Sequence, residues 1–252
     1  MGQKRQVPSE RLLLEARILW CKLNPYFYLL AYNLILSSKT TTDFCGNKRV
    51  HRKTCPKDNG TPRVVGYFEG WARDRPCNVF WPEQIPDGLY THINFAFATI
   101  DPITFKVGPS SETDIGLIRR LMTLKKRDPK LKVYVAIGGW SFNDPGPTYH
   151  TFSGLAASVP RQKAFANSLL SFMDTYGFDG VDLDWEYPVD SDRGGRAVDF
   201  ANFPKWMERL KSTLDSSKKG LTITIPASYW YLQHFDIKSL VSWTLLLAQP
   251  QS

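Results

Sequence analysis

Acidic residues crowd one short segment of the chain, where Asp179, Asp182, Asp184 and Glu186 stand within eight residues. Side chains at alternate positions of a β-strand point to the same face, so Asp182, Asp184 and Glu186 would form one row, with neighbours about 6–7 Å apart. Crowding and burial raise the pKa of at least one carboxyl group in such a row. A carboxyl group with a raised pKa can hold a proton near neutral pH and act as a general acid. The row therefore predicts acid–base catalysis at the end of a buried strand.

Two other interpretations of the row remain open at this point. A row of acids could bind a divalent cation, but the neighbouring residues are aromatic rather than Asn or further acids. A solvated surface strand would leave Val181, Leu183 and Trp185 as its sole buried face. We favour catalysis, expect these three side chains to face covering helices, and predict neither a metal site nor a cofactor.

The segments around the row alternate between strand and helix patterns. Runs of β-branched and aromatic residues predict strands at 63–68, 92–98, 131–137, 178–185 and 221–225. Apolar positions at three and four spacing predict helices near 112–126, 161–176 and 198–216. This alternation indicates an α/β fold with a parallel sheet, and strand starts roughly 30 to 45 residues apart favour a (β/α)8 TIM barrel.

Active sites of such barrels lie at the carboxyl ends of the strands, where Glu186 falls. A doubly wound sheet is the alternative fold. It would need a glycine-rich phosphate turn after the first strand, and residues 69–73 lack the G-x-G-x-x-G pattern.

The segment 178–188, with the sequence FDGVDLDWEYP, resembles the active-site signature of family 18 glycoside hydrolases, the chitinases. It matches the D-x-x-D-x-D-x-E pattern of that family at every fixed position. Residues 135–140 resemble the S-x-G-G motif of the third strand, with Ala136 in place of Ser, and residues 66–71 and 96–98 resemble the first two strands. Residues 43–55 resemble the linker of fungal killer-toxin-like members.

The resemblance implies hydrolysis of β-1,4 bonds between N-acetylglucosamine units, with chitin or its oligosaccharides as the partner, by an extracellular enzyme. It implies that Glu186 protonates the glycosidic oxygen while the acetamido carbonyl of the substrate attacks the anomeric carbon. Asp184 would orient the acetamido group and Asp182 would share a proton with Asp184. Sugar contacts are expected from residues at strand ends, namely Tyr67, Trp71, Phe97, Gly138, Gly139, Trp140, Tyr187 and Trp230.

The resemblance extends over about residues 63–243, and about five of the eight βα units can be identified. The M-x-Y-D motif of the family's sixth strand and its late Trp have no counterpart, and residues 244–252 match no family pattern. We therefore expect an incomplete, C-terminally truncated barrel. A catalytically inactive fragment, a chitin-binding lectin and an endo-N-acetylglucosaminidase acting on glycoproteins are the alternative functions.

The charge distribution argues against nucleic acid as a partner. Residues 64–252 contain 20 Lys and Arg and 20 Asp and Glu, so the formal net charge of +8 comes from residues 1–63. A nucleic-acid enzyme would carry its basic surface on the folded domain. The sequence makes no prediction about the oligomeric state.

The N-terminal part divides into two expected segments. Residues 1–42 are apolar and basic, and either a signal-anchor or a mis-assigned start would explain them, because no A-x-A cleavage site follows. The longest uncharged stretch, 23–38, has 16 residues, which is short for a stable membrane span. Residues 43–62 are the expected linker, with Cys45 and Cys55 as a disulfide candidate. The catalytic domain is expected to occupy residues 63–252.

Overall fold

Parallel strands form the centre of the fold in the computed structural model, which describes residues 63–249. The strands are β1 (Val65–Glu69), β2 (His92–Ile100), β4 (Lys132–Gly138), β5 (Gly180–Asp184), β6 (Gly220–Pro226) and β7 (Leu245–Gln249). They pair side by side in the order β1-β2-β4-β5-β6-β7, and every one of these pairs is parallel. A short strand, β3 (Val107–Pro109), pairs with β2 in the antiparallel direction.

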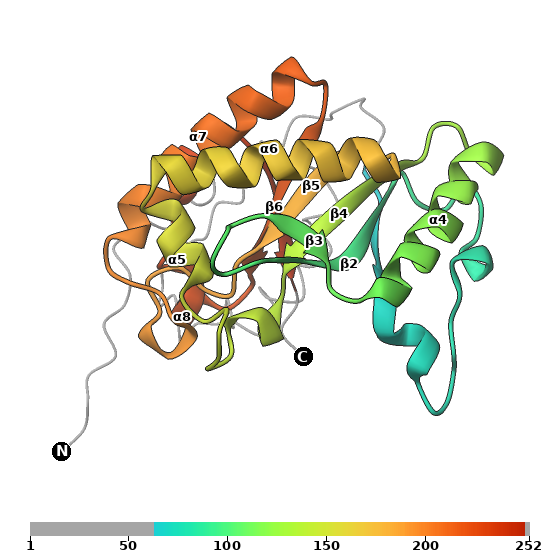
Figure 1. The fold of residues 1–252 in the computed structure, drawn as a ribbon, viewed down its shortest axis with the longest axis horizontal. Helices are drawn as coiled ribbons and strands as arrows, with labels where there is room; N and C mark the ends of the chain where they lie inside the picture. Colours follow the sequence, from blue (N-terminus) through green and yellow to red (C-terminus); the bar gives the residue numbers. More distant parts are fainter. Residues whose placement is uncertain (1–62, 250–252) are drawn as a thin grey trace, which may run out of the picture. The chain divides into compact units, whose positions relative to one another are not determined.

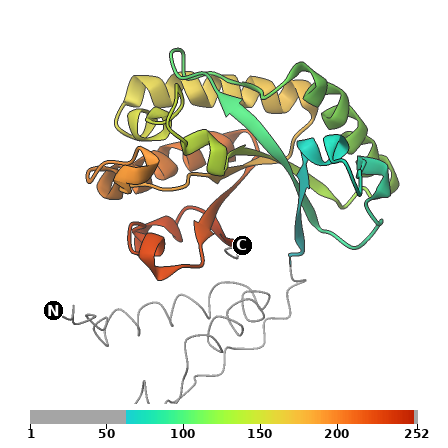
Figure 2. The same ribbon diagram turned by 90° about the horizontal axis from the view of Figure 1, so that it is seen from below.

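Helices cover the outer face of this curled sheet (Figures 1 and 2). The long helices are α4 (Glu112–Arg127), α6 (Val159–Tyr176) and α7 (Asp199–Ser216), and the short ones are α5 (Thr151–Ala156), α8 (Tyr229–Leu232) and α9 (Ile237–Leu240). Four 3-10 turns complete the elements, η1 (Gly70–Asp74), η2 (Pro82–Gln84), η3 (Trp140–Asn143) and η4 (Ser191–Arg193). The three long helices confirm the three predicted from apolar spacing.

The strand order follows the chain order without reversal. A doubly wound sheet reverses its order at a switch point, so that alternative is excluded for the described residues. Parallel strands that are added one after another, with helices on the outside, form the wall of a barrel. The described part of the chain is therefore an incomplete (β/α)8 barrel, as predicted.

The interpretation of the sequence missed one strand. Residues Leu245–Gln249 form β7, whose partners in β6 run from Thr222 to Pro226. Three consecutive leucines in this segment hide the two-residue period of a strand, although only Leu246 of the three is buried. The described residues thus contain six parallel strands rather than the five that were expected.

The outward-facing side chains of the acidic segment are core residues. Trp185 stacks on Phe152 of α5, with ring centres 5.5 Å apart, and meets Phe203 of α7 edge-on at 5.2 Å. Val181, Leu183 and Trp185 are all buried. Buried aromatic side chains contribute much of the apolar area of a core, at about 150–250 Å² each. This packing confirms the expected orientation of the segment and holds the acids toward the inside.

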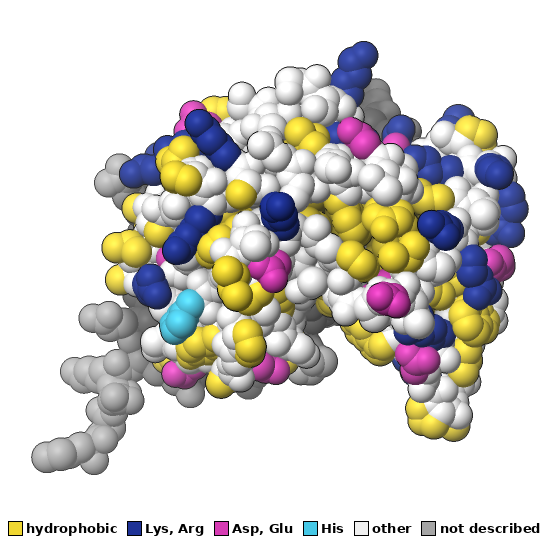
Figure 3. Space-filling view, viewed as in Figure 1, with side chains coloured by type: hydrophobic (Ala, Val, Ile, Leu, Met, Phe, Trp, Pro, Cys, Tyr) yellow, Lys and Arg dark blue, Asp and Glu magenta, His cyan; other side chains and the backbone are white. Residues whose placement is uncertain are grey.

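The surface of the described residues carries mixed charges. On the face shown in Figure 3, Lys and Arg side chains are spread out, with Asp and Glu side chains between them. Among residues 63–249, no helix has the length and apolar character that crossing a membrane requires. The predictions for residues 1–42, for residues 43–62 and for the Cys45–Cys55 pair lie outside the described residues.

Candidate active site

Strand β5 places the acidic row in the middle of the sheet. Asp182 and Asp184 lie on β5 and Glu186 follows two residues after its end, and the three residues are 0%, 2% and 4% exposed. Asp179 lies off the row, where it accepts hydrogen bonds from the Val133 amide at 2.8 Å and from Lys125 at 2.7 Å. Asp179 therefore ties β5 to its surroundings, and the other three acids share the inner face.

Three hydroxyl groups surround the carboxylate of Asp182. The hydroxyl of Tyr67 donates to Oδ2 at 2.7 Å, Thr222 donates to Oδ1 at 2.5 Å and Thr224 donates to Oδ2 at 3.1 Å. Burial raises the pKa of Asp182, and the hydrogen bonds from these hydroxyls oppose that rise. Donors of this kind stabilise the ionised form, so Asp182 is the acid of the row best suited to carry the negative charge.

Thr222 and Thr224 are site residues that the interpretation of the sequence missed. The strand register places Asp182 between Ala136 of β4 and Thr222 of β6. Ala136 stands where the family motif has a serine, so the hydroxyl groups beside Asp182 come from β6 and from Tyr67. The sequence did contain one sign of them: Thr222 and Thr224 stand at alternate positions of the predicted strand 221–225, so their side chains point to the same face of that strand.

Asp184 has fewer hydrogen-bond donors around its carboxyl group than Asp182 has. Its Oδ1 is buried without a hydrogen-bond partner among the residues that the structure describes. Burial raises its pKa well above the ordinary value, and the neighbouring charges of Glu186 and Asp182 raise it further. The pKa of Asp184 is therefore raised further than that of Asp182, whose carboxylate keeps its three hydroxyl donors.

Glu186 combines burial with one nearby cation. Burial raises its pKa above the ordinary value, while a hydrogen bond involving Tyr187 and the charge of Arg193 oppose the rise. The result is a carboxyl group that holds its proton to higher pH than a free glutamate. A group with this property at a barrel mouth can donate a proton to a leaving oxygen.

We predict a pH-dependent stability that follows from Asp184. Because its native pKa is raised, the folded chain binds more protons than the unfolded chain above pH ~3.9, the ordinary Asp value. Stability should therefore fall as the pH rises from that value toward the native pKa. The variant Asp184→Asn should show a smaller fall, measured as the free energy of unfolding in urea at several pH values.

The exposed carboxyl group of Asp192 provides the control. Its variant Asp192→Asn removes the same charge and should keep the pH dependence of the unmodified chain. Equal pH dependence in the unmodified chain and in Asp184→Asn would contradict the account.

Predicted sugar-binding aromatic residues form a partly exposed group near the row. Trp71 lies in η1, directly after β1, and stacks on Phe97 of β2 with ring centres 5.9 Å apart. Trp140 begins η3, after β4, and meets Tyr187 edge-on at 6.5 Å. Trp71 and Trp140 are 49% and 51% exposed, so flat indole surface remains open to a ligand.

The remaining predicted aromatic residues differ in exposure. Tyr187 is buried and stacks on Tyr231 at 4.2 Å, a contact that sequence analysis did not anticipate. The ring of Tyr67 is partly exposed on β1, although its hydroxyl reaches Asp182. Trp230 lies on α8 beyond the end of β6 and is 69% exposed. The structure therefore places Tyr67 and Tyr187 next to the acids and Trp230 farther along the chain, on a separate helix.

Two glycines bring the neighbouring backbones together. Gly138 has φ 114°, and a Cβ atom there would lie 2.1 Å from the carbonyl oxygen of Asp184. A Cβ at Gly139 would lie 2.7 Å from the ring of Phe97, and its amide donates to the Asp184 carbonyl at 2.9 Å. These positions need glycine for packing around the row, whatever contact they make with a sugar.

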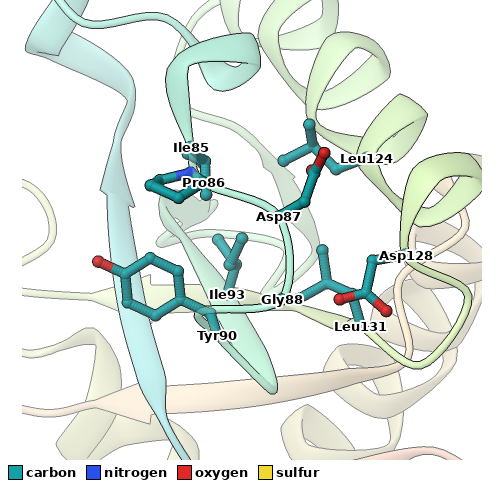
Figure 4. A pocket seen from close by; sticks show the side chains of 9 residues that line it. All are labelled: Ile85, Pro86, Asp87, Gly88, Tyr90, Ile93, Leu124, Asp128 and Leu131. Atoms are coloured by element: carbon teal, nitrogen blue, oxygen red, sulfur yellow. The ribbon is translucent and has the colours of Figure 1, made fainter.

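A cavity elsewhere in the fold is too small for a sugar. It has a volume of about 10 Å³, close to what one water molecule needs. Figure 4 shows its lining, which includes Tyr90, Ile93 and Leu131 near the amino ends of β2 and β4. Among residues 63–249, no group of three or more His, Cys, Asp or Glu side chains is arranged to hold a metal ion.

Comparison with known proteins identifies the class that this fold and site define. Residues 63–244 match the family described as Glycosyl hydrolases family 18. The chain therefore belongs to this family, and the family expected from the acidic signature is confirmed.

Individual relatives agree with the family. Over 203 residues the chain is 30% identical to the killer toxin subunits alpha/beta of Kluyveromyces lactis, covering 79% of this chain and 17% of that protein. It is 37% identical over 160 residues to a probable endochitinase of Caenorhabditis elegans, covering 60% and 24%. Catalytic domain 2 of the Group II chitinase of Ostrinia furnacalis, solved with (NAG)5, superposes with a TM-score of 0.67 at 26% identity, covering 74% and 50%. The chain thus spans half or less of each of these relatives.

Proposed function

We propose that this chain hydrolyses β-1,4 bonds between N-acetylglucosamine units of chitin by substrate-assisted retaining catalysis. The observation that carries the proposal is the row of three buried acids, with Asp182 and Asp184 on β5 and Glu186 two residues beyond its end. Burial raises the pKa of all three carboxyl groups, and hydrogen bonds from hydroxyl groups oppose the rise at Asp182. Half-exposed indole rings of Trp71 and Trp140 lie near the same end of the strands. Relatives that are chitinases, one of them solved with (NAG)5, support the choice of substrate.

The proposed first step is a proton transfer from Glu186 to the glycosidic oxygen. The bond between that oxygen and the anomeric carbon breaks as the acetamido carbonyl oxygen of the same sugar attacks the anomeric carbon, which gives an oxazolinium ion. A water molecule then gives up a proton to the ionised Glu186 and attacks the anomeric carbon from the face that the leaving group occupied. This attack opens the oxazolinium ring, and the sugar keeps its β configuration. Glu186 recovers its proton in this second step.

Asp184 would bind the acetamido group in both steps. Its buried Oδ1 has no partner among the described residues and so is available to accept the acetamido N–H. A shift of its proton toward Asp182 would leave a negative charge beside the oxazolinium ion, which stabilises that ion. The three hydroxyl groups around Asp182 keep the pair oriented.

We also propose that the catalytic part comprises residues 63–252, after a linker at 43–62 and a separate segment at 1–42. Chitin is an extracellular polymer, so we propose that the enzyme acts outside the cell. The neutral charge balance of residues 64–252 suits an uncharged polysaccharide better than a polyanion.

Product analysis tests the proposed function. The purified chain should convert penta-N-acetylchitopentaose into shorter oligosaccharides and release no glycan from a high-mannose glycoprotein. Released glycan without cleavage of the chitin oligomer would instead support an endo-N-acetylglucosaminidase. Binding of the oligomer without cleavage would support a lectin, and either result would contradict the proposal.

A further inference from the structure

Arg193 is the one buried Lys or Arg side chain among residues 63–249. It lies on η4, in the loop that follows β5 and Glu186. Removing a cation from water is costly unless its donors are paired. Arg193 lies beside the proposed general acid, and the partners of its donors offset the cost of burying its charge.

The guanidinium group joins two loops of the site. Its Nε donates to the carbonyl oxygen of Glu186 at 3.0 Å, and its Nη1 donates to Oδ1 of Asp144 at 2.8 Å. Its Nη2 donates to the carbonyl oxygen of Trp140. Asp144 and Trp140 follow β4, whereas Glu186 follows β5. One planar side chain thus connects the loop that carries the general acid to the loop that carries an exposed tryptophan.

The same guanidinium group covers one face of the Trp140 ring. Its central carbon lies 3.8 Å from the ring centre, which is the geometry of a cation–π contact. Trp140 is nevertheless 51% exposed, so indole surface remains available to solvent. Arg193 therefore supports the indole from one side and leaves surface on which a sugar can stack.

A second set of contacts fixes the loop from which Arg193 projects. Asn143 donates to the carbonyl oxygen of Arg193 at 3.3 Å, and the hydroxyl of Tyr149 donates to the Ser191 carbonyl at 2.6 Å. The Nδ1 atom of His150 lies 2.9 Å from the Gly194 carbonyl oxygen. Because these partners all belong to the loop after β4, the two loops form one connected unit.

We propose that Arg193 is a positioning residue that holds the indole of Trp140 and the backbone of Glu186 in a single geometry. A sugar stacked on Trp140 then presents its glycosidic oxygen to the Glu186 carboxyl group. The part of this inference that concerns sugar rests on the proposed function. The part that concerns the orientation of Trp140 does not.

The first test measures Trp140 directly, without substrate. The full chain is labelled with 5-fluorotryptophan, and the 19F signal of Trp140 is assigned as the one missing from Trp140→Phe. We expect Arg193→Gln and Arg193→Lys to shift or broaden this signal. Gln lacks the charge, and Lys keeps the charge but lacks the planar guanidinium group with its several N–H donors. Arg196→Gln, an exposed arginine of the same loop, should leave the signal unchanged.

Each outcome of the first test decides the inference. An unchanged Trp140 signal in folded Arg193→Lys would overturn it. If Arg193→Gln fails to fold, as judged by circular dichroism, Arg193→Lys provides the decision. Unfolding of both variants would also overturn the inference, since Arg193 would then serve the fold as a whole.

The second test is kinetic and uses penta-N-acetylchitopentaose. Arg193→Lys should raise KM and lower kcat, each by about tenfold, because both the stacking surface and the acid lose their fixed positions. A residue that only supports folding would lower kcat with the amount of folded enzyme and leave KM unchanged, which would overturn the inference. If the unmodified chain cleaves no chitin oligomer, the proposed function fails, and the 19F signal still decides the role of Arg193.

Discussion

Replacing Glu186 by Gln is expected to lower kcat on penta-N-acetylchitopentaose by about 10²–10⁴-fold, the usual range for loss of a general acid. Gln has nearly the same shape but no proton to donate at neutral pH. Because Glu186 is buried and its raised pKa reflects an unfavourable environment for the charge, the amide should leave the fold intact. Initial rates, with circular dichroism as the check of folding, provide the measurement.

The matched control for this variant is Glu208→Gln. Glu208 is exposed on α7, outside the acidic row, so its change should leave kcat unaltered. Binding of the oligosaccharide, followed by tryptophan fluorescence, should persist in Glu186→Gln. A folded Glu186→Gln variant that retained full kcat would contradict the assignment of Glu186 as the proton donor.

Replacing Gly138 by Ala is expected to destabilise the fold by about 2–5 kcal/mol. The positive φ of Gly138 costs a residue with a side chain roughly 1–2 kcal/mol, and the overlap with the Asp184 carbonyl adds about 1–3 kcal/mol. A decrease of Tm by about 5–20 °C follows for a domain of this size. The displaced backbone of Asp184 should also reduce activity, because the carboxyl group of Asp184 moves with it.

Replacing a second glycine by alanine is expected to raise the stability of the fold rather than lower it. Gly116 is exposed on α4, and a Cβ atom there would have open space around it. Gly116→Ala should therefore stabilise the chain by about 0.5–1 kcal/mol, since alanine favours the helix. Equal Tm values for Gly138→Ala and the unmodified chain would contradict the close approach of β4 and β5.

The fold and the acidic row were predictable because their signals are local. Alternation of acidic and apolar residues in 179–186 indicated both faces of β5, and Trp185 does pack against helices as expected. Strands rich in β-branched residues and helices with regular apolar spacing also show in short windows of sequence. β7 was missed because its leucine run lacks alternation, and its pairing with β6 is a tertiary contact.

The surroundings of the row depend on contacts between distant segments. Thr222 and Thr224 reach Asp182 only through the register of β5 and β6, and Tyr67 reaches it from β1. Arg193 meets Trp140 because two loops fold against each other. No local pattern shows which residues of distant segments meet. Sequence analysis therefore found the acids, Tyr67 and Trp140, but not the contacts that Thr222, Thr224 and Arg193 make with them.

The anomeric configuration of the first product tests the central claim most directly. Proton NMR can follow the reducing ends released from penta-N-acetylchitopentaose before they equilibrate in water. Substrate-assisted catalysis by Glu186 and Asp184 predicts that the β-anomer forms first and the α-anomer appears later by mutarotation. Initial formation of the α-anomer, or no product beyond that of Glu186→Gln, would contradict the account.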